Sequence, residues 1–109
     1  MSLKLVDKTA ALASDRSIAV PTVEFENAHT IVHRFKIPPG AQVGWHKHEN
    51  DYLTVQLSHG RLELTHADGK VIVIDYKPGV SRYIAAPVEH NAVNIGDVDI
   101  EVLEIEYRR

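Results

Sequence analysis

The stretch "PPGAQVGWHKHENDYLTVQLSHG", residues 38–60, decides how this 109-residue chain is expected to fold. It opens with a Pro-Pro-Gly turn at 38–40, which cannot continue a hydrogen-bonded β-ladder. His46 and His48 follow, and side chains two residues apart in a strand point to the same face. The two imidazoles therefore share a face, with Lys47 turned away. Two imidazoles placed in this way can converge on one metal ion.

The chain outside this stretch also has the two-residue alternation that is typical of strands. In "HTIVHRFKI", residues 29–37, apolar side chains and one histidine share a face and the charged side chains share the other. The pair Asp68-Gly69 between "ELTH" and "KVIVIDY" predicts a tight hairpin. A helical turn is expected only within residues 7–15. Short strands separated by Gly/Pro turns predict an all-β sandwich or barrel.

Composition narrows the class of protein. The chain is 44% hydrophobic and 25% charged with a formal net charge of −3, which is typical of one globular domain and offers no basic patch for nucleic acid. The absence of cysteine excludes disulfides and thiolate ligands. No run approaches the ~18 apolar residues of a membrane span, and no signal-peptide core is visible. We therefore expect a cytoplasmic protein that binds neither nucleic acid nor membrane.

The histidine pair gains meaning from its surroundings, because the chain has seven histidines and a His-x-His pair is a weak motif by itself. Gly40 followed by His46 and His48 resembles the opening of the first motif of the cupin family, and Gly60 falls close to the closing glycine of that motif. The segment "PGVSRYIAAPVEHNAVN" resembles the second cupin motif, which involves the residues Gly79, Ala85, Pro87, His90 and Asn94.

Within that family, "PPGAxxGWHxHxxDY" followed by "VEHN" is similar to small cupins associated with β-alanine catabolism. The resemblance implies a double-stranded antiparallel β-helix, or jelly-roll barrel. It implies a single cupin domain over residues 1–109, with an N-terminal arm at about 1–24 and a barrel at about 25–107. It also implies that the motif histidines point into the barrel and hold a divalent transition metal. The alternative is a partly wet barrel without metal. The implied ligands are His46, His48 and His90.

The chain departs from the first cupin motif at one ligand. The motif normally supplies a glutamate separated from its second histidine by three or four residues, where this chain has Tyr52 and Leu53. Simple alternation would turn Tyr52 toward the metal, whereas a bulge would bring Asp51 inward. Three possibilities stay open: a three-histidine site with Tyr52 as a neighbour, or direct coordination by Tyr52 or by Asp51. Iron, zinc, nickel, manganese and copper all accept imidazole, so the metal is not identified.

Other polar residues are candidates for a substrate pocket. His33 lies on the apolar face of its strand, and Gln56 shares a face with Tyr52 if alternation persists. A slipped register would turn both Gln56 and Tyr52 outward. Arg82 could bind a carboxylate if it points inward. Three histidines near strand ends and turns are expected at the surface: His29, His59 and His66.

The expected function is a metal-dependent enzyme that acts on a small polar metabolite, by dioxygenase-like or other metal-assisted chemistry on a carbonyl or carboxylate compound. Tyr52 would serve as a proton donor or as a fourth ligand. Two alternatives stay open: a non-catalytic cupin that binds a small ligand or metal, and a metal-free isomerase or epimerase that uses a histidine–tyrosine pair. We expect a homodimer formed through the N-terminal arm or strand edges.

Overall fold

The structure is a computed structural model that describes residues 4–5 and 16–108. These residues form ten β-strands and no helix, so the predicted all-β class is confirmed and none of them forms a helix that could cross a membrane. The helical turn expected within 7–15 lies outside the described residues. The strands are β1 (Lys4–Leu5), β2 (Thr22–Glu26), β3 (Thr30–Ile37), β4 (His46–His48), β5 (Tyr52–Gln56), β6 (Gly60–His66), β7 (Val71–Tyr76), β8 (Ser81–Ile84), β9 (Val88–Asn94) and β10 (Ile100–Tyr107).

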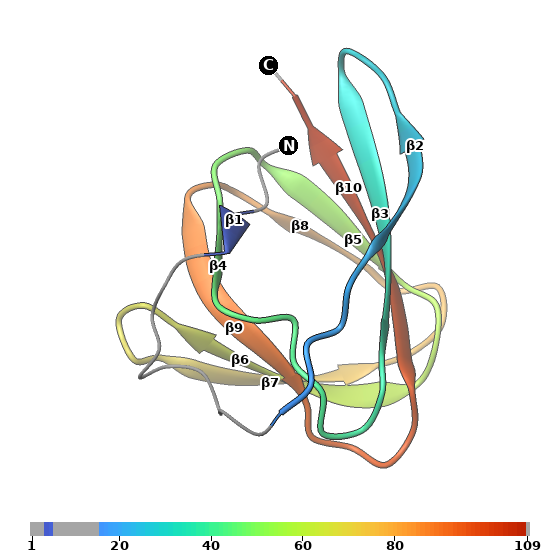
Figure 1. Cartoon of the computed structure of the whole chain (residues 1–109), viewed down its shortest axis with the longest axis vertical. Coiled ribbons are helices and arrows are strands. Elements are labelled where there is room, and N and C mark those ends of the chain that lie inside the picture. Colours follow the sequence, from blue (N-terminus) through green and yellow to red (C-terminus); the bar gives the residue numbers. More distant parts are fainter. Residues whose placement is uncertain (1–3, 6–15, 109) are drawn as a thin grey trace.

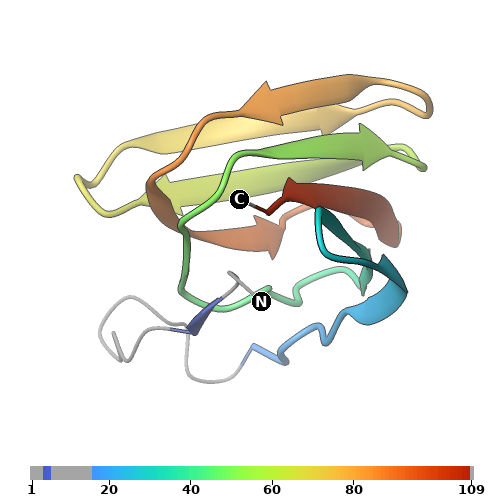
Figure 2. The ribbon, with the colours of Figure 1, turned by 90° about the horizontal axis from the view of Figure 1, so that it is seen from above.

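The strands form two five-stranded sheets, and every pair of neighbouring strands is antiparallel (Figure 1). Sheet A has the order β1-β4-β9-β6-β7, and sheet B has the order β2-β3-β10-β5-β8. The chain passes back and forth between the sheets, which is the jelly-roll arrangement that the motifs predict. Strands β7 and β8 lie at one side of the molecule, and β1 and β2 lie at the opposite side (Figure 2).

The core lies between the inner faces of the two sheets, because strands such as β3, β4 and β5 alternate buried and more exposed side chains. In β3 the side chains of Ile31, His33, Phe35 and Ile37 are buried. Phe35 and Ile37 belong to an apolar cluster that also contains side chains from β6, β9 and β10. Burial of one such side chain stabilises the fold by about 1.5–3 kcal/mol. The alternation therefore fixes which residues face the interior.

Turns carry the chain between strands where the sequence predicts them. Asp68 and Gly69 connect β6 to β7, and the Asp68 carboxylate accepts a hydrogen bond from the Lys70 amide at 2.9 Å. Gly60, where β6 begins in sheet A, has a φ of +148°, and a Cβ there would lie 2.5 Å from Cγ1 of Ile100. Glycine is therefore required at the crossing from sheet B to sheet A.

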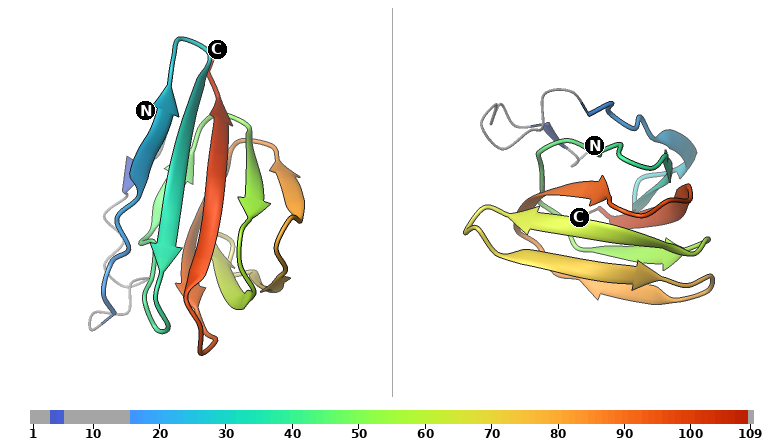
Figure 3. Two further views of the ribbon diagram at one scale, coloured as in Figure 1. Left: turned by 90° about the vertical axis from the view of Figure 1, so that its right-hand side faces the viewer. Right: turned by 90° about the horizontal axis from the view of Figure 1, so that it is seen from below.

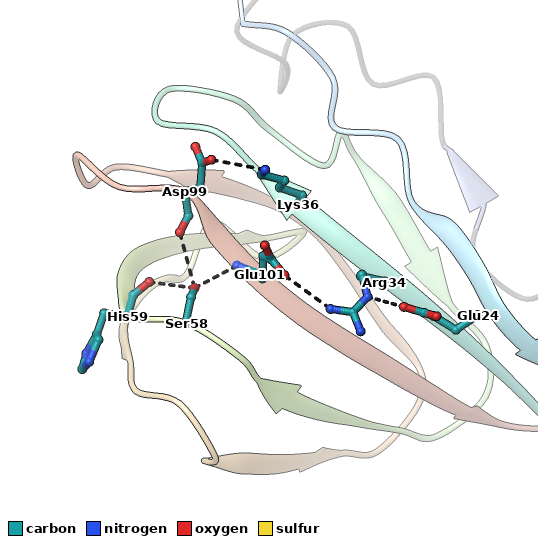
Figure 4. Close-up of polar contacts among 7 residues, drawn as sticks. All are labelled: Glu24, Arg34, Lys36, Ser58, His59, Asp99 and Glu101. Carbon is teal, nitrogen blue, oxygen red and sulfur yellow. Dashed lines mark hydrogen bonds and ion pairs between the residues drawn. The ribbon is translucent and has the colours of Figure 1, made fainter.

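The register of β10 decides which side chains meet inside sheet B. The left panel of Figure 3 shows β10 (red) between β3 (cyan) and β5 (green), with β8 at the edge. Glu104 lies directly opposite His33 on one side and Thr54 on the other. Polar contacts on the outer surface tie the start of β10 to its neighbours (Figure 4): Arg34 binds Glu24 and Glu101, Lys36 lies 3.7 Å from Asp99, and the Glu101 amide donates to the Ser58 hydroxyl at 2.8 Å.

Candidate metal centre

Three buried histidines from sheet A come together inside the barrel. His46 of β4 lies directly opposite His90 of β9, and His48 lies two residues further along β4. The ring centroid of His46 lies 4.7 Å from that of His48 and 4.6 Å from that of His90. Each ring offers one nitrogen, and these nitrogens lie within 4.8 Å of one another. In the described part of the chain, His46, His48 and His90 are therefore the group of side chains that could hold a metal ion.

The hydrogen bonds of these rings leave nitrogen lone pairs available. His46 Nδ1 lies 2.7 Å from the Gly44 carbonyl oxygen, so Nδ1–H donates to that carbonyl and Nε2 carries the free lone pair. Within the described residues, His46 Nε2, both nitrogens of His48 and His90 Nδ1 are buried without a partner. An unsatisfied buried polar atom costs about 1–3 kcal/mol. Several such atoms in one place fit a metal ion that they would ligate.

The charge state of the rings also fits a metal. Burial lowers the pKa of His46 to about 4. Burial, followed by the charges of neighbouring histidines, lowers the pKa of His48 to about 3 and that of His90 to about 2. The three imidazoles are therefore neutral at pH 7, which is the form that binds metals. Three imidazole donors suit a divalent transition metal.

Tyr52 and Asp51 lie differently with respect to this group. The Tyr52 ring is buried and stacks on His48 with a centroid separation of 4.0 Å. The Asp51 carboxylate accepts hydrogen bonds from the Tyr83 hydroxyl and, at 2.8 Å, from the Ala86 amide. Asp51 therefore holds the start of β5 to the segment after β8 and is not one of the side chains gathered around the histidine nitrogens.

A cavity of about 100 Å³ lies between the sheets beside this group. His46, His90, Tyr52 and Arg82 line it. Of the other two residues predicted for the pocket, His33 and Gln56 are buried but do not line this cavity. His33 Nε2 has no partner among the described residues, and burial lowers the pKa of the ring. Gln56 accepts a hydrogen bond from the Lys77 amide at 2.8 Å, so it holds the turn after β7.

The expectation that His66 is a surface group is wrong. Its side chain is half-buried and lines the cavity, and its ring centroid lies 5.4 Å from that of His90. The cause is the strand pairing, because His66 lies opposite His90, which lies opposite His46. Three imidazoles thus form a row across β4, β9 and β6. His66 could not be predicted to join this row, because the sequence does not give the pairing of β6 with β9 and places His66 only at a strand end.

The sequence analysis also missed Glu104. Burial, and secondarily the negative charge of Glu106, raises the pKa of the Glu104 carboxyl to about 8. Glu104, Thr54 and Arg82 lie side by side on β10, β5 and β8, and all three line the cavity. A signal was present in "IEVLEIEYR", where Glu104 alternates in phase with Val102, a residue of the apolar core.

Comparison with known proteins agrees with this geometry. The cupin domain family matches residues 33–106. The chain is 36% identical to the beta-alanine degradation protein BauB of Pseudomonas aeruginosa over 98 residues, which cover 87% of this chain and 99% of that protein. It is 33% identical to an oxalate-binding protein of Thermotoga maritima over 72 residues, 66% of this chain and 57% of that protein.

A solved structure of a cupin domain from Bordetella pertussis is similar throughout. It superimposes with a TM-score of 0.83 and 34% sequence identity, over 89% of this chain and 100% of that structure. An RmlC-like cupin with a double-stranded β-helix fold from Methanocaldococcus jannaschii has a TM-score of 0.69 at 20% identity over 89% of this chain and 86% of that structure, which supports the fold alone. The family match, the relatives and the histidine arrangement agree: the chain belongs to the cupin family.

Proposed function

We propose that this cupin is a metal-dependent enzyme that acts on a small polar metabolite. The metal is a divalent transition metal, and His46, His48 and His90 hold it. One observation carries the proposal: neutral imidazole nitrogens without partners converge inside the barrel, within 4.8 Å of one another. A barrel that needed these histidines only for packing would satisfy their nitrogens with hydrogen bonds.

The donor set indicates chemistry rather than a structural role. Three neutral imidazoles leave the full charge of a divalent ion in place and leave coordination positions open, so the ion supplies Lewis acidity or, for iron, oxygen activation. The cavity beside the histidines supports access for a small molecule. The two curated relatives, a β-alanine degradation protein and an oxalate-binding protein, support a small polar ligand.

The chain's own residues divide the remaining work. Burial above all, and then the charge of Glu104, raises the pKa of the Tyr52 phenol, so its hydroxyl keeps its proton at neutral pH. Tyr52 stacks on His48 and borders the cavity, which suits it to hold or donate a proton at its hydroxyl oxygen. The Gly44 carbonyl orients the His46 ring. Leu62 and Leu64 of β6 and Ile72 and Ile74 of β7 give the cavity an apolar side that would limit the access of water.

Elemental analysis of untagged protein tests the metal site. We expect about one equivalent of metal in wild type and in Asp51→Ala, and near-complete loss in His48→Ala. His59→Ala is the matched control, because His59 is an exposed histidine that lies outside the cavity. Loss of metal in Asp51→Ala would place the carboxylate among the ligands. Metal-free wild type, even after reconstitution, would overturn the proposal.

Turnover separates the enzyme from a binding protein. Metal-loaded protein is incubated with a panel of short oxo-, hydroxy- and carboxylic acids, and oxygen uptake and product formation are followed. We expect at least one compound to be consumed by wild type and by His59→Ala, but not by His48→Ala or after chelation. Retention of a compound without conversion would indicate a binding protein, as the name of the oxalate-binding relative suggests. Full activity after chelation would indicate a metal-free isomerase or epimerase.

A further inference from the structure

A polar row crosses the inner face of sheet B, on the wall of the cavity that lies opposite the core strands of sheet A. It consists of Glu104 on β10, Thr54 on β5 and Arg82 on β8, which are direct cross-strand neighbours. Its neighbours on this sheet are mixed: His33 lies opposite Glu104 on β3 and Tyr52 and Gln56 flank Thr54 on β5, whereas Val102 and Ile84 are apolar. Polar side chains beside apolar ones inside a barrel are costly unless they meet a partner.

The protein itself does not supply that partner. Neither the Glu104 carboxyl nor the Arg82 guanidinium has a hydrogen bond or an ion pair with another side chain in the described part of the chain. The Thr54 hydroxyl lies 3.5 Å from the Arg82 carbonyl oxygen, a long contact that leaves it available. The Glu104 and Arg82 side chains are both half-buried and line the cavity, so one small molecule in the cavity can reach both.

The charge of Arg82 sets the sign of the ligand. Its guanidinium always carries a positive charge and offers five donors in a planar fork that matches a carboxylate. That charge reaches the cavity: after burial and the neighbouring histidines, it is among the causes that lower the pKa of His90. An anionic ligand would satisfy Arg82, whereas a neutral or cationic ligand would leave its charge unpaired.

Glu104 is compatible with an anion only in its protonated form, and burial favours that form by raising its pKa to about 8. A protonated carboxyl has an O–H donor that needs an acceptor oxygen. A cavity of about 100 Å³ is well below the ~300–1,000 Å³ of pockets for drug-sized molecules, so the ligand is small. Its carbon atoms would contact the apolar side chains Leu62, Leu64, Ile72, Ile74 and Val102.

We propose that the row formed by Glu104, Thr54 and Arg82 recognises a short-chain carboxylate, which ion-pairs with the Arg82 guanidinium and accepts a hydrogen bond from the protonated Glu104 carboxyl. This inference rests on the proposed function in one respect, since it names the substrate class of that enzyme. A carboxylate held on sheet B would direct the rest of the molecule toward the histidines of sheet A. A phosphate dianion is disfavoured, because the wall offers one cation.

The environment of Glu104 makes binding dependent on pH. Ionised Glu104 would repel the anion and would lose its donor, so affinity falls as the pH rises past about 8. The titratable and charged groups around Glu104 are Glu106 on the same strand, His33 opposite it on β3, and the cavity-lining residues His46, Tyr52, His66, Tyr76, Arg82 and His90.

Propanoate is the probe, with propanamide as its neutral analogue and inorganic phosphate as the competing anion. Binding is followed by chemical-shift titration of ¹⁵N-labelled protein treated with EDTA, so that metal cannot capture the carboxylate. We expect propanoate to bind at least about tenfold more tightly than propanamide and phosphate, because a charge-assisted hydrogen bond contributes about a tenfold factor or more. Stronger binding of phosphate, or equal binding of the amide, would overturn the proposal.

Substitutions locate the site. Arg82→Gln should weaken propanoate binding about tenfold or more, and Arg82→Lys should weaken it less because the charge remains. Arg61→Gln is the matched control: Arg61 is exposed and pairs with Asp75 on the outer surface, so affinity should stay within about twofold. Equal affinity of wild type and Arg82→Gln would overturn the proposal.

The role of Glu104 is read from the pH profile rather than from affinity at one pH. Wild-type affinity for propanoate should fall several-fold between pH 6.5 and 9.5, and Glu104→Gln should remove that fall because a carboxamide donates at both pH values. A fall that persists in Glu104→Gln would assign the effect to another group and exclude Glu104 from the site.

Metal content of the untreated protein, measured before EDTA is added, separates the two proposals. Protein that holds metal as purified but, after EDTA treatment, does not bind propanoate through Arg82 would overturn this inference and leave the metal centre standing. Protein that holds no metal even after reconstitution, yet binds propanoate through Arg82, would overturn the metal-dependent function and leave the carboxylate site standing.

Discussion

The histidines on the sheet A wall of the cavity and Glu104 on its sheet B wall are uncharged for opposite reasons. On sheet A, burial lowers the pKa of His46, His48 and His90, so the imidazoles have lost their protons at pH 7. On sheet B, burial raises the pKa of Glu104, so this carboxyl keeps its proton. One wall therefore presents lone pairs and the other an O–H donor beside the guanidinium of Arg82. A dry interior selects the uncharged form of each group, and that selection gives each wall its chemistry.

The largest consequence of this difference is acid sensitivity of the metal-free protein. The histidine pKa values lie below the unfolded value of 6.5, so unfolded chains bind more protons and stability falls as the pH drops below 6.5. Three histidines give a slope of up to about 4 kcal/mol per pH unit. Urea unfolding of EDTA-treated Glu104→Gln at pH 7, 6 and 5.5 measures it, because the Glu104 carboxyl of wild type titrates with the opposite sign in this range. A slope below that of a single proton would contradict the neutral histidines.

The contribution of Glu104, on the sheet B wall of the cavity, should change with pH in the opposite direction. The Glu104 pKa is raised from 4.5 to about 8, so the contribution of this one carboxyl to stability falls as the pH rises from 4.5 through 8. Glu104→Gln does not titrate and should be more stable than wild type by about 3–4 kcal/mol at pH 8, with little difference near pH 4.5. Thermal unfolding at both pH values checks this, with the outward-facing Glu63→Gln as control. Equal gains at both pH values would refute a titration effect.

Replacing His48 by leucine removes two unpartnered nitrogen atoms from the sheet A wall of the cavity. His48 is buried with both ring nitrogens unpartnered in the described part of the chain, so His48→Leu should stabilise metal-free protein by about 1–3 kcal/mol. The same variant should lose its metal. Denaturant unfolding and elemental analysis measure the two effects together. Destabilisation of metal-free His48→Leu would show that the ring is held by interactions other than those described.

The smallest effect is expected where the two walls meet, at Tyr52. Tyr52→Phe keeps the ring that stacks on His48, so stability should change by less than about 1 kcal/mol and metal stoichiometry should stay at one. Elemental analysis decides between the roles left open for this residue. Retained metal together with reduced turnover supports a proton donor, whereas loss of metal would make the Tyr52 oxygen a ligand.

The sequence predicted the three histidines on the sheet A wall far better than it predicted Glu104 and its neighbours on the sheet B wall. His46 and His48 lie on one strand, so the two-residue period alone puts them together, and the family resemblance adds His90. The alternation also predicts that Tyr52 and Gln56 face inward, and both are buried. These features depend on residues that are close in the chain or on a motif.

Glu104 and His66 depend on pairing between distant strands. The pattern of β10 indicates that Glu104 faces inward, but its neighbours Thr54 and Arg82 follow from the order β10-β5-β8 in sheet B. His66 likewise meets His90 only through the pairing of β6 with β9. A period of two says which face a side chain occupies, and it says nothing about which strand lies alongside.

The strand order also determines when the proposed centre can assemble in a cell. His90 follows the His46–His48 pair by about 40 residues, a delay of roughly 2–8 s at ordinary rates of synthesis. The middle strand of sheet B, β10, is made later still, and such long-range pairings fold slowly. Throughout this interval the nascent chain offers two imidazoles instead of three. A metal at the proposed centre would therefore be acquired after these strands have been synthesised, from the ions that the cell then supplies, and its identity would depend on availability as well as on ligands.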